Sequence, residues 1–272
     1  MKRVRISGMC ALLALAVSAA GATVAQAATH SLPEVGRCVK VATGAGAYTT
    51  ATCVKKATNG LGKFEWTPVS VTEKQTFSGA GGEVTLATTG HQTIRCVAAN
   101  FSGEYTGPKT ATVQIEFQAC TNPQEQQCQS LDPRNKSEIA TFPMEGELGF
   151  VRNQTIEGRT FITVGMDLKP QPPLHELMSY ECTGSTEVAH VEGSVIARLR
   201  PFDKMTTESN LQYLVKKNVG QIPEQFEGGP KDTLITTFTS GLETLGTAPS
   251  TLNIVGYFGH NANPLEIKAK EN

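Results

Sequence analysis

Short alternating runs of polar and apolar residues dominate this chain from about residue 37 onward. The clearest run covers residues 112–118, where Val113, Ile115 and Phe117 alternate with polar side chains. Because successive side chains of an extended strand point to opposite faces, these three apolar residues share one face. The run therefore predicts an antiparallel strand with one buried side and one solvent-facing side.

The same alternation predicts further strands along most of the chain. They are expected at residues 37–41, 83–86, 93–97, 161–168, 194–199, 210–215, 233–238, 252–258 and 265–268. Turn-forming pairs such as Asn59-Gly60, Gly81-Gly82 and Pro172-Pro173 separate these runs. Helical periodicity is weak, and only residues 173–179 and 210–217 could hold a turn or two of helix. We therefore predict an all-β fold, either an antiparallel β-sandwich or an irregular barrel.

The first 27 residues have the composition of a signal peptide. Three basic residues near the start precede an apolar run over residues 9–24, and Ala25-Gln26-Ala27 offers small residues where a signal peptidase cuts. The mature chain is expected to begin at Ala28 and to be exported. It would then be secreted or held at the cell surface.

Six of the seven cysteines remain after this cleavage. They are Cys38, Cys53, Cys96, Cys120, Cys128 and Cys182. An even number of cysteines in an exported chain favours disulfide bonds, here three. Short loops between neighbouring strands favour the pairs 38–53, 96–120 and 128–182. Exchange of partners among the last four cysteines stays open, because six cysteines allow fifteen pairings.

A polar, turn-prone stretch between residues 120 and 137 divides the mature chain near its middle. It predicts an N-terminal β unit over residues 28–125 and a C-terminal β unit over residues 126–272. If Cys128 instead bonds to Cys96 or Cys120, the stretch is a loop inside one continuous β domain over residues 30–272. Both organisations fit the composition.

The charge of the mature chain is mildly acidic. The leader holds three of the 24 basic residues and none of the 25 acidic ones, which leaves 21 basic against 25 acidic residues. No cluster of Lys and Arg is present, so a nucleic-acid partner is not expected. No apolar run of ~18 residues follows the leader, so no membrane insertion is expected after cleavage.

Patterns that carry catalysis or bind metals are absent or broken. The chain has no Gly-x-Ser-x-Gly elbow and no Cys-x-x-Cys pair. His175-Glu176 could open a zinc-protease helix, but Ser179 stands where the second histidine belongs. No Asp-x-Asp-x-Asp-Gly calcium loop occurs, and no pair of carboxylates is singled out. We predict a protein that is not an enzyme, with no catalytic residues, no metal site and no cofactor.

The single tryptophan marks the best candidate for ligand binding. Phe64, Glu65 and Trp66 lie in a short apolar and acidic stretch near the first cysteine pair. An exposed Trp66 beside Phe64 could stack on a sugar ring. Alternatively, Phe64 and Trp66 share one face of a strand and fill the core there. Aromatic residues make up only 6% of the chain, which favours the core because sugar binders usually show several such rings.

Several segments occur in a distinctive order. They are residues 103–110 (Gly-Glu-Tyr-Thr-Gly-Pro-Lys-Thr), 128–130, 137–141, 192–196, 226–229 and 265–268. This order resembles a group of uncharacterised exported proteins of soil actinobacteria, over roughly residues 80–270. The resemblance implies a bacterial, secreted, β-rich protein. It implies no activity, and it carries over no functional residue.

These observations lead to three hypotheses about function. The first is a secreted or cell-surface structural or binding protein, whose partner would be cell-wall glycan or another secreted protein. Recognition would then centre on the loops at residues 63–67 and 102–109. The second is a secreted hydrolase acting on polysaccharide or cell wall, with a dispersed site. The third is a secreted protease inhibitor that presents the loop between Cys120 and Cys128.

Overall fold

The computed structural model describes residues 31–91, 93–131, 137–216 and 220–270. The predicted signal peptide lies outside these residues. Twenty strands and one short 3-10 helix, η1 (Thr58–Gly60), make up the regular structure of the described chain. The prediction of an all-β protein is therefore confirmed.

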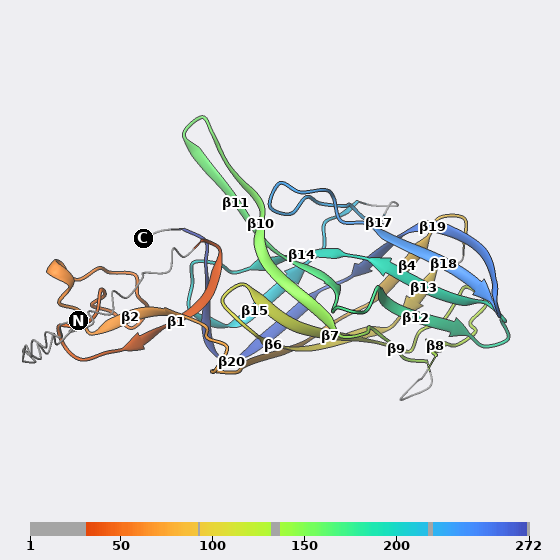
Figure 1. Ribbon diagram of the computed structural model, residues 1–272, viewed down its shortest axis with the longest axis horizontal. Coiled ribbons are helices and arrows are strands. Elements are labelled where there is room, and N and C mark those ends of the chain that lie inside the picture. Colours follow the sequence, from red (N-terminus) through yellow and green to blue (C-terminus); the bar gives the residue numbers. More distant parts are fainter. Residues whose placement is uncertain (1–30, 92, 132–136, 217–219, 271–272) are drawn as a thin grey trace, which may run out of the picture. The chain divides into compact units, whose positions relative to one another are not determined.

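Eight strands form a closed antiparallel ring, and most of them are labelled in Figure 1. In order around the ring they are β15 (Thr206–Gln212), β14 (Val195–Arg200), β11 (Arg159–Pro170), β10 (Met144–Ile156), β7 (Thr110–Gln118), β6 (Ala98–Tyr105), β3 (Gln75–Gly81) and β20 (Tyr257–Lys268). The ring closes because β20 pairs with β3 and also with β15. Three more strands extend this sheet: β9 (Ile139–Ala140) beside β7, and β1 (Glu34–Lys40) followed by β2 (Phe64–Pro68) beside β20.

A second antiparallel sheet contains seven strands. Its order is β5 (Ile94–Cys96), β4 (Val84–Thr88), β19 (Glu243–Ile254), β18 (Leu234–Ser240), β13 (Val188–Gly193), β12 (Glu176–Cys182) and β8 (Cys128–Ser130). A separate ribbon joins β16 (Val215–Lys216) to β17 (Gly220–Gln221). One hydrophobic cluster contains residues of both large sheets, including Ile115 of β7, Met178 of β12 and Leu252 of β19.

Residues 112–118 lie in a strand with one buried face, as their alternating pattern predicts. Along β7 every second residue is buried, and Val113, Ile115 and Phe117 each expose 6% or less of their surface. The residues between them face outward and are partly exposed. The outer face of β7 is thus free to carry polar chemistry, while its inner face holds the fold together.

Aromatic side chains fill the inside of the ring. The ring centroid of Phe77 lies 4.9 Å from that of Tyr105, and the centroid of Phe101 lies 4.3 Å from that of Tyr257. Gly103 leaves room for Phe77, because a Cβ at this position would collide with the Phe77 ring. The cavity that remains is about 20 Å³, room for a single water molecule and no organic ligand. The interior of the ring therefore does not hold an organic ligand.

Three predictions of local structure were wrong. Residues 210–217 were allowed a turn of helix, but the described part of this stretch contains the end of β15 and all of β16. Residues 173–179 were allowed a turn of helix, but β12 begins at Glu176 and pairs with β13 and β8. The predicted strand at residues 252–258 is divided into the end of β19 and the start of β20. Gly256, with a φ of 62°, supplies the left-handed conformation that this turn requires.

The three disulfides follow the favoured pairing. Cys38 bonds to Cys53, Cys96 to Cys120 and Cys128 to Cys182. The last pair joins neighbouring strands, since Cys128 of β8 lies opposite Cys182 of β12 in the register. Exchange of partners among the last four cysteines does not occur in this structure.

The division into two β units at residues 125 and 126 stays a prediction. In the described residues, the ring combines β3, β6 and β7 with five later strands. The second sheet likewise combines β4 and β5 with five later strands.

Candidate functional site

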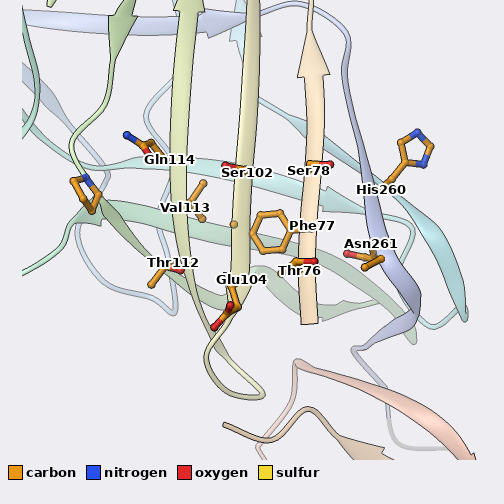
Figure 2. Close-up of a pocket in the computed structure, with 13 residues that line it drawn as sticks. Thr76, Phe77, Ser78, Ser102, Glu104, Thr112, Val113, Gln114, His260 and Asn261 are labelled. Carbon is orange, nitrogen blue, oxygen red and sulfur yellow. The ribbon is translucent and has the colours of Figure 1, made fainter. Parts of the chain in front are cut away.

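A groove of about 620 Å³ lies on the outer surface of the ring, over β3, β6 and β7 (Figure 2). Pro143, which precedes β10, borders it beside β7, and His260 of β20 borders it beside β3. Ser102 and Glu104 of β6 lie on its floor, so the groove includes the beginning of the predicted recognition segment at residues 102–109.

Strand register arranges the groove's polar side chains in two rows. His260 pairs with Ser78, Ser78 with Ser102, and Ser102 with Gln114. We call these four residues the histidine row. Two positions further along the strands, Thr76 pairs with Glu104 and Glu104 with Thr112, and these three form the glutamate row. Figure 2 shows both rows running across the strands.

The spacing of the rows follows from sheet geometry. Neighbouring strands lie about 4.8 Å apart, so the four residues of the histidine row extend over roughly 14 Å. Residues two positions apart on a strand are about 6.8 Å apart, which separates the two rows. The groove therefore presents a regular array of polar groups whose long direction crosses the strands.

Most of these polar groups are not used by the fold. Glu104 forms an ion pair of 3.2 Å with Lys74, and the amide of Gln114 donates a hydrogen bond of 3.4 Å to the carbonyl of Thr141. Among the described residues, no partner holds the hydroxyls of Ser78, Ser102 or their neighbours Thr76 and Thr112. Such hydroxyls are free to donate to a ligand and to accept from it.

Asn261 of β20 is an unsatisfied acceptor on the inner side of the ring, because it pairs with the inward-facing Phe77. Its side chain is 92% buried, and its Oδ1 has no hydrogen-bond partner in the described structure. A buried acceptor of this kind usually receives a hydrogen bond from water or from a bound molecule. Because this side chain lies on the opposite face of β20 from His260, a buried water, and not a ligand of the outer groove, is placed to supply that donor.

The groove carries little net charge. Lys74 neutralises Glu104, and His260 is solvent-exposed at the groove's edge. The remaining lining residues carry hydroxyl, amide or apolar side chains, or are glycine. This surface fits a neutral ligand that is rich in hydroxyl or amide groups, rather than a strongly charged one.

Trp66 is half-buried. It is therefore neither a fully exposed platform for a sugar nor a fully buried core residue, the two environments that the sequence allowed. Its Nε1 donates a hydrogen bond of 2.9 Å to Oε2 of Glu266. The Nζ of Lys268 lies 4.7 Å from the centre of the indole ring, and Gly36 lies against the ring's edge. The indole N–H and part of the ring surface are therefore already engaged within the protein.

The neighbours of Trp66 are also engaged in structural contacts. Glu65 accepts a hydrogen bond of 2.7 Å from the backbone N–H of Ala47, and Phe64 is half-buried on β2. None of Phe64, Glu65 and Trp66 lines the groove. Ligand binding by these three residues stays a prediction.

A second polar cluster lies on the second sheet. Both carboxylate oxygens of Glu176 on β12 are 3.1 Å from Nδ1 of His190 on β13. Nε2 of His190 is 3.2 Å from the hydroxyl of Thr239 on β18. A carboxylate, an imidazole and a hydroxyl in this order resemble the arrangement that activates a nucleophile in hydrolases.

The loop that could act as an inhibitor is ordered by its own side chains. Oδ1 of Asn122 accepts hydrogen bonds of 3.0 Å from the backbone N–H groups of Gln124 and Gln126. Cys120 and Cys128 at its ends bond to different partners, Cys96 and Cys182. Protease inhibition by this loop stays a prediction.

Three buried carboxyl groups affect the stability of the protein. Burial raises the pKa of Asp167 and Asp232 above the ordinary 3.8, and that of Glu266 above 4.5. In the unfolded chain these groups lose their protons at the ordinary values, whereas the folded chain retains them to higher pH. The stability that these three groups contribute is therefore present at acidic pH and is lost as pH rises through their folded-state pKa values.

We expect the melting temperature to be higher near pH 4.5 than at pH 8. The test is a thermal melt across this range for the mature protein and for Asp167→Asn, which removes one of the three groups. The variant should show a weaker dependence on pH. A wild-type melting temperature that rises steadily toward pH 8 would contradict this assignment.

In the part of the chain that the structure describes, no group of three or more His, Cys, Asp or Glu residues is placed to hold a metal ion. No described helix is long and apolar enough to cross a membrane.

Only part of the groove was predicted from the sequence. It selected residues 102–109 as a recognition segment, but not Ser78, Gln114 or His260. These residues come together only through strand pairing, for which the sequence gives no direct signal. Comparison with known proteins adds no assignment, because no family model, curated protein or solved structure matches this chain.

Proposed function

We propose that this protein is an exported, non-enzymatic binding protein and that it holds a glycan in the groove over β3, β6 and β7. The observation that carries the proposal is the array of uncommitted hydroxyl and amide groups in the histidine and glutamate rows. Sugars present hydroxyl groups that both donate and accept hydrogen bonds, as do the serine and threonine side chains of this array.

Export is part of the proposal. The three disulfides agree with an oxidising compartment outside the cytoplasm, where such bonds persist. The predicted leader over residues 1–27 and the resemblance to exported actinobacterial proteins point to a bacterial protein that is secreted or held at the cell surface. In that location, cell-wall glycan is the abundant partner for a hydroxyl-rich groove.

The test is a pull-down on insoluble chitin and on cell-wall glycan, with the mature protein and the double variant Ser78→Val and Ser102→Val. Valine suits an exposed strand, so the variant should fold and melt like the wild type. Loss of both hydroxyls should weaken binding by about tenfold or more, as expected for two or more lost hydrogen bonds. Thr237→Val on β18 is the matched control and should bind like the wild type.

The pattern among variants decides between the candidate sites. Retention that survives Ser78→Val and Ser102→Val but disappears in Trp66→Ala would assign binding to Phe64, Glu65 and Trp66 instead. Failure of the wild type to bind any glycan would overturn the proposal. In that case the partner would be sought among other secreted proteins.

A secreted hydrolase is the second candidate, and the Glu176–His190–Thr239 cluster favours it. In such an enzyme His190 would take the proton of Thr239, and Glu176 would orient the imidazole. A cluster of this type cleaves ester or amide bonds, so the same incubations separate the two functions when chromatography shows whether acetyl groups or peptides are released from the cell-wall glycan. Release that His190→Ala abolishes would establish the hydrolase, and unmodified glycan supports the binding protein.

A further inference from the structure

We infer that the ligand of the groove is an extended, β-1,4-linked, neutral glycan that lies across the strands from β20 to β7. This inference rests on the proposed function and specifies its ligand. It follows from the regular spacing of side chains along the histidine row, from the distance between the two rows, and from the balance of charge in the groove. Figure 2 shows the side chains of both rows.

The spacing along the histidine row selects the type of linkage. His260, Ser78 and Ser102 repeat once per strand, and neighbouring strands are about 4.8 Å apart. The sugar units of a β-1,4-linked chain are extended and repeat at a similar distance, so each unit can face one strand. An α-1,4-linked chain curls into a helix and cannot keep this register over several strands.

The separation of the two rows fits the shape of such a chain. In a β-1,4-linked glycan the ring substituents are equatorial, so hydroxyl and N-acetyl groups project from both edges of a flat ribbon. Ser78 and Ser102 would face one edge, and Thr76 and Thr112 the other edge, about 6.8 Å away. The backbone at Gly103, which separates Ser102 from Glu104 on β6, lies between the two edges.

The groove offers a polyanionic glycan no excess of positive charge. Glu104 lies within the array, and Lys74 offsets its negative charge without leaving an excess of positive charge. A chain of uronic acids or sulfated sugars would place further negative groups beside Glu104. A neutral chain of glucose or N-acetylglucosamine meets no such repulsion.

The length of the array sets the number of units that bind. The histidine row crosses four strands over roughly 14 Å, so three to four sugar units can each reach a polar side chain. Affinity should therefore rise from the disaccharide to the tetrasaccharide, by roughly tenfold or more as two units add their hydrogen bonds. Longer oligosaccharides should add little.

The experiment is isothermal titration of the mature protein with N-acetylglucosamine oligomers of two, four and six units, and with maltohexaose. We expect the affinity to rise from two to four sugar units and to change little between four and six units. We expect no binding of the α-linked maltohexaose. The double variant with Ser78→Val and Ser102→Val should lose most of the gain in affinity between two and four sugar units. The control variant Thr237→Val should keep this gain.

The outcomes separate this inference from the function on which it rests. Equal affinity for all lengths, or equal binding of maltohexaose, would overturn the extended β-1,4 ligand and leave glycan binding in place. Tighter binding of a polyuronic acid would overturn the neutral assignment. If no oligosaccharide and no insoluble glycan binds, both the inference and the proposed function fail.

Discussion

Replacing Asp232 with alanine is expected to lower the free energy of unfolding by about 3–5 kcal/mol. Asp232 is 94% buried and accepts hydrogen bonds from the backbone N–H groups of Ile196 and Glu224 and from the amide of Gln221. Alanine leaves these donors buried without an acceptor, which is costlier than the loss of an exposed bond. Urea unfolding of the mature protein measures the change.

The same segment contains a second buried contact that depends on Asp232. Glu224 is 92% buried and holds Arg198 through two hydrogen bonds of 2.6 and 2.8 Å. Asp232→Asn keeps one acceptor oxygen and should cost about half as much as the alanine variant. Glu243→Ala, at an exposed position of β19, is the control and should change stability by less than about 0.5 kcal/mol. If Asp232→Ala proves as stable as Glu243→Ala, the assigned network does not support the fold.

Removing the disulfide between Cys128 and Cys182 is expected to cost about 4 kcal/mol, the largest loss among the three bridges. This bridge closes a span of 54 residues, against 24 residues for Cys96–Cys120 and 15 for Cys38–Cys53. A longer span restricts the unfolded chain more, so the shortest bridge should contribute about 3 kcal/mol. Double alanine variants at each pair, compared by thermal and urea unfolding, give the order.

The order of these losses is the informative result. Cys38→Ala with Cys53→Ala serves as the matched comparison, because it removes the same atoms from the shortest span. If that variant proves the least stable of the three, constraint of the unfolded chain is not the main contribution of the bridges. Equal melting of the reduced and oxidised wild type would mean that none of the three bridges stabilises the fold.

The fold class was predictable because half-buried strands impose a visible period of two. The prediction for residues 112–118 differs from β7 by two residues at one end. β12 was not recognised, since four successive residues from Leu177 to Tyr180 are all buried and leave no alternation. Continuous burial removes the period that separates a strand from a short helix.

Strand partners were not predictable in the same way. Alternation assigns each side chain to a face, but it does not say which strand lies beside it. β20 pairs with β3 and β15, so residues near position 260 meet residues near positions 78 and 209. Closure of the ring therefore depends on long-range pairing and became visible only in the structure.

The residues of the candidate site were also not predictable, because strand pairing brings them together. Trp66 attracted attention because a single tryptophan is conspicuous in the sequence, yet its N–H is bonded to Glu266. Ser78 and Ser102 are ordinary residues in a chain rich in small polar side chains, and only their register makes them neighbours. A site built from common residues on several strands leaves no local motif to find.

The most direct test of the account is NMR shift mapping of the mature protein titrated with the hexamer of N-acetylglucosamine. The account predicts that the largest backbone amide shifts fall on β3, β6 and β7, at Ser78, Ser102 and Gln114, with His260 also affected. Shifts centred on Trp66 and β2 would contradict it, as would a spectrum that the sugar leaves unchanged.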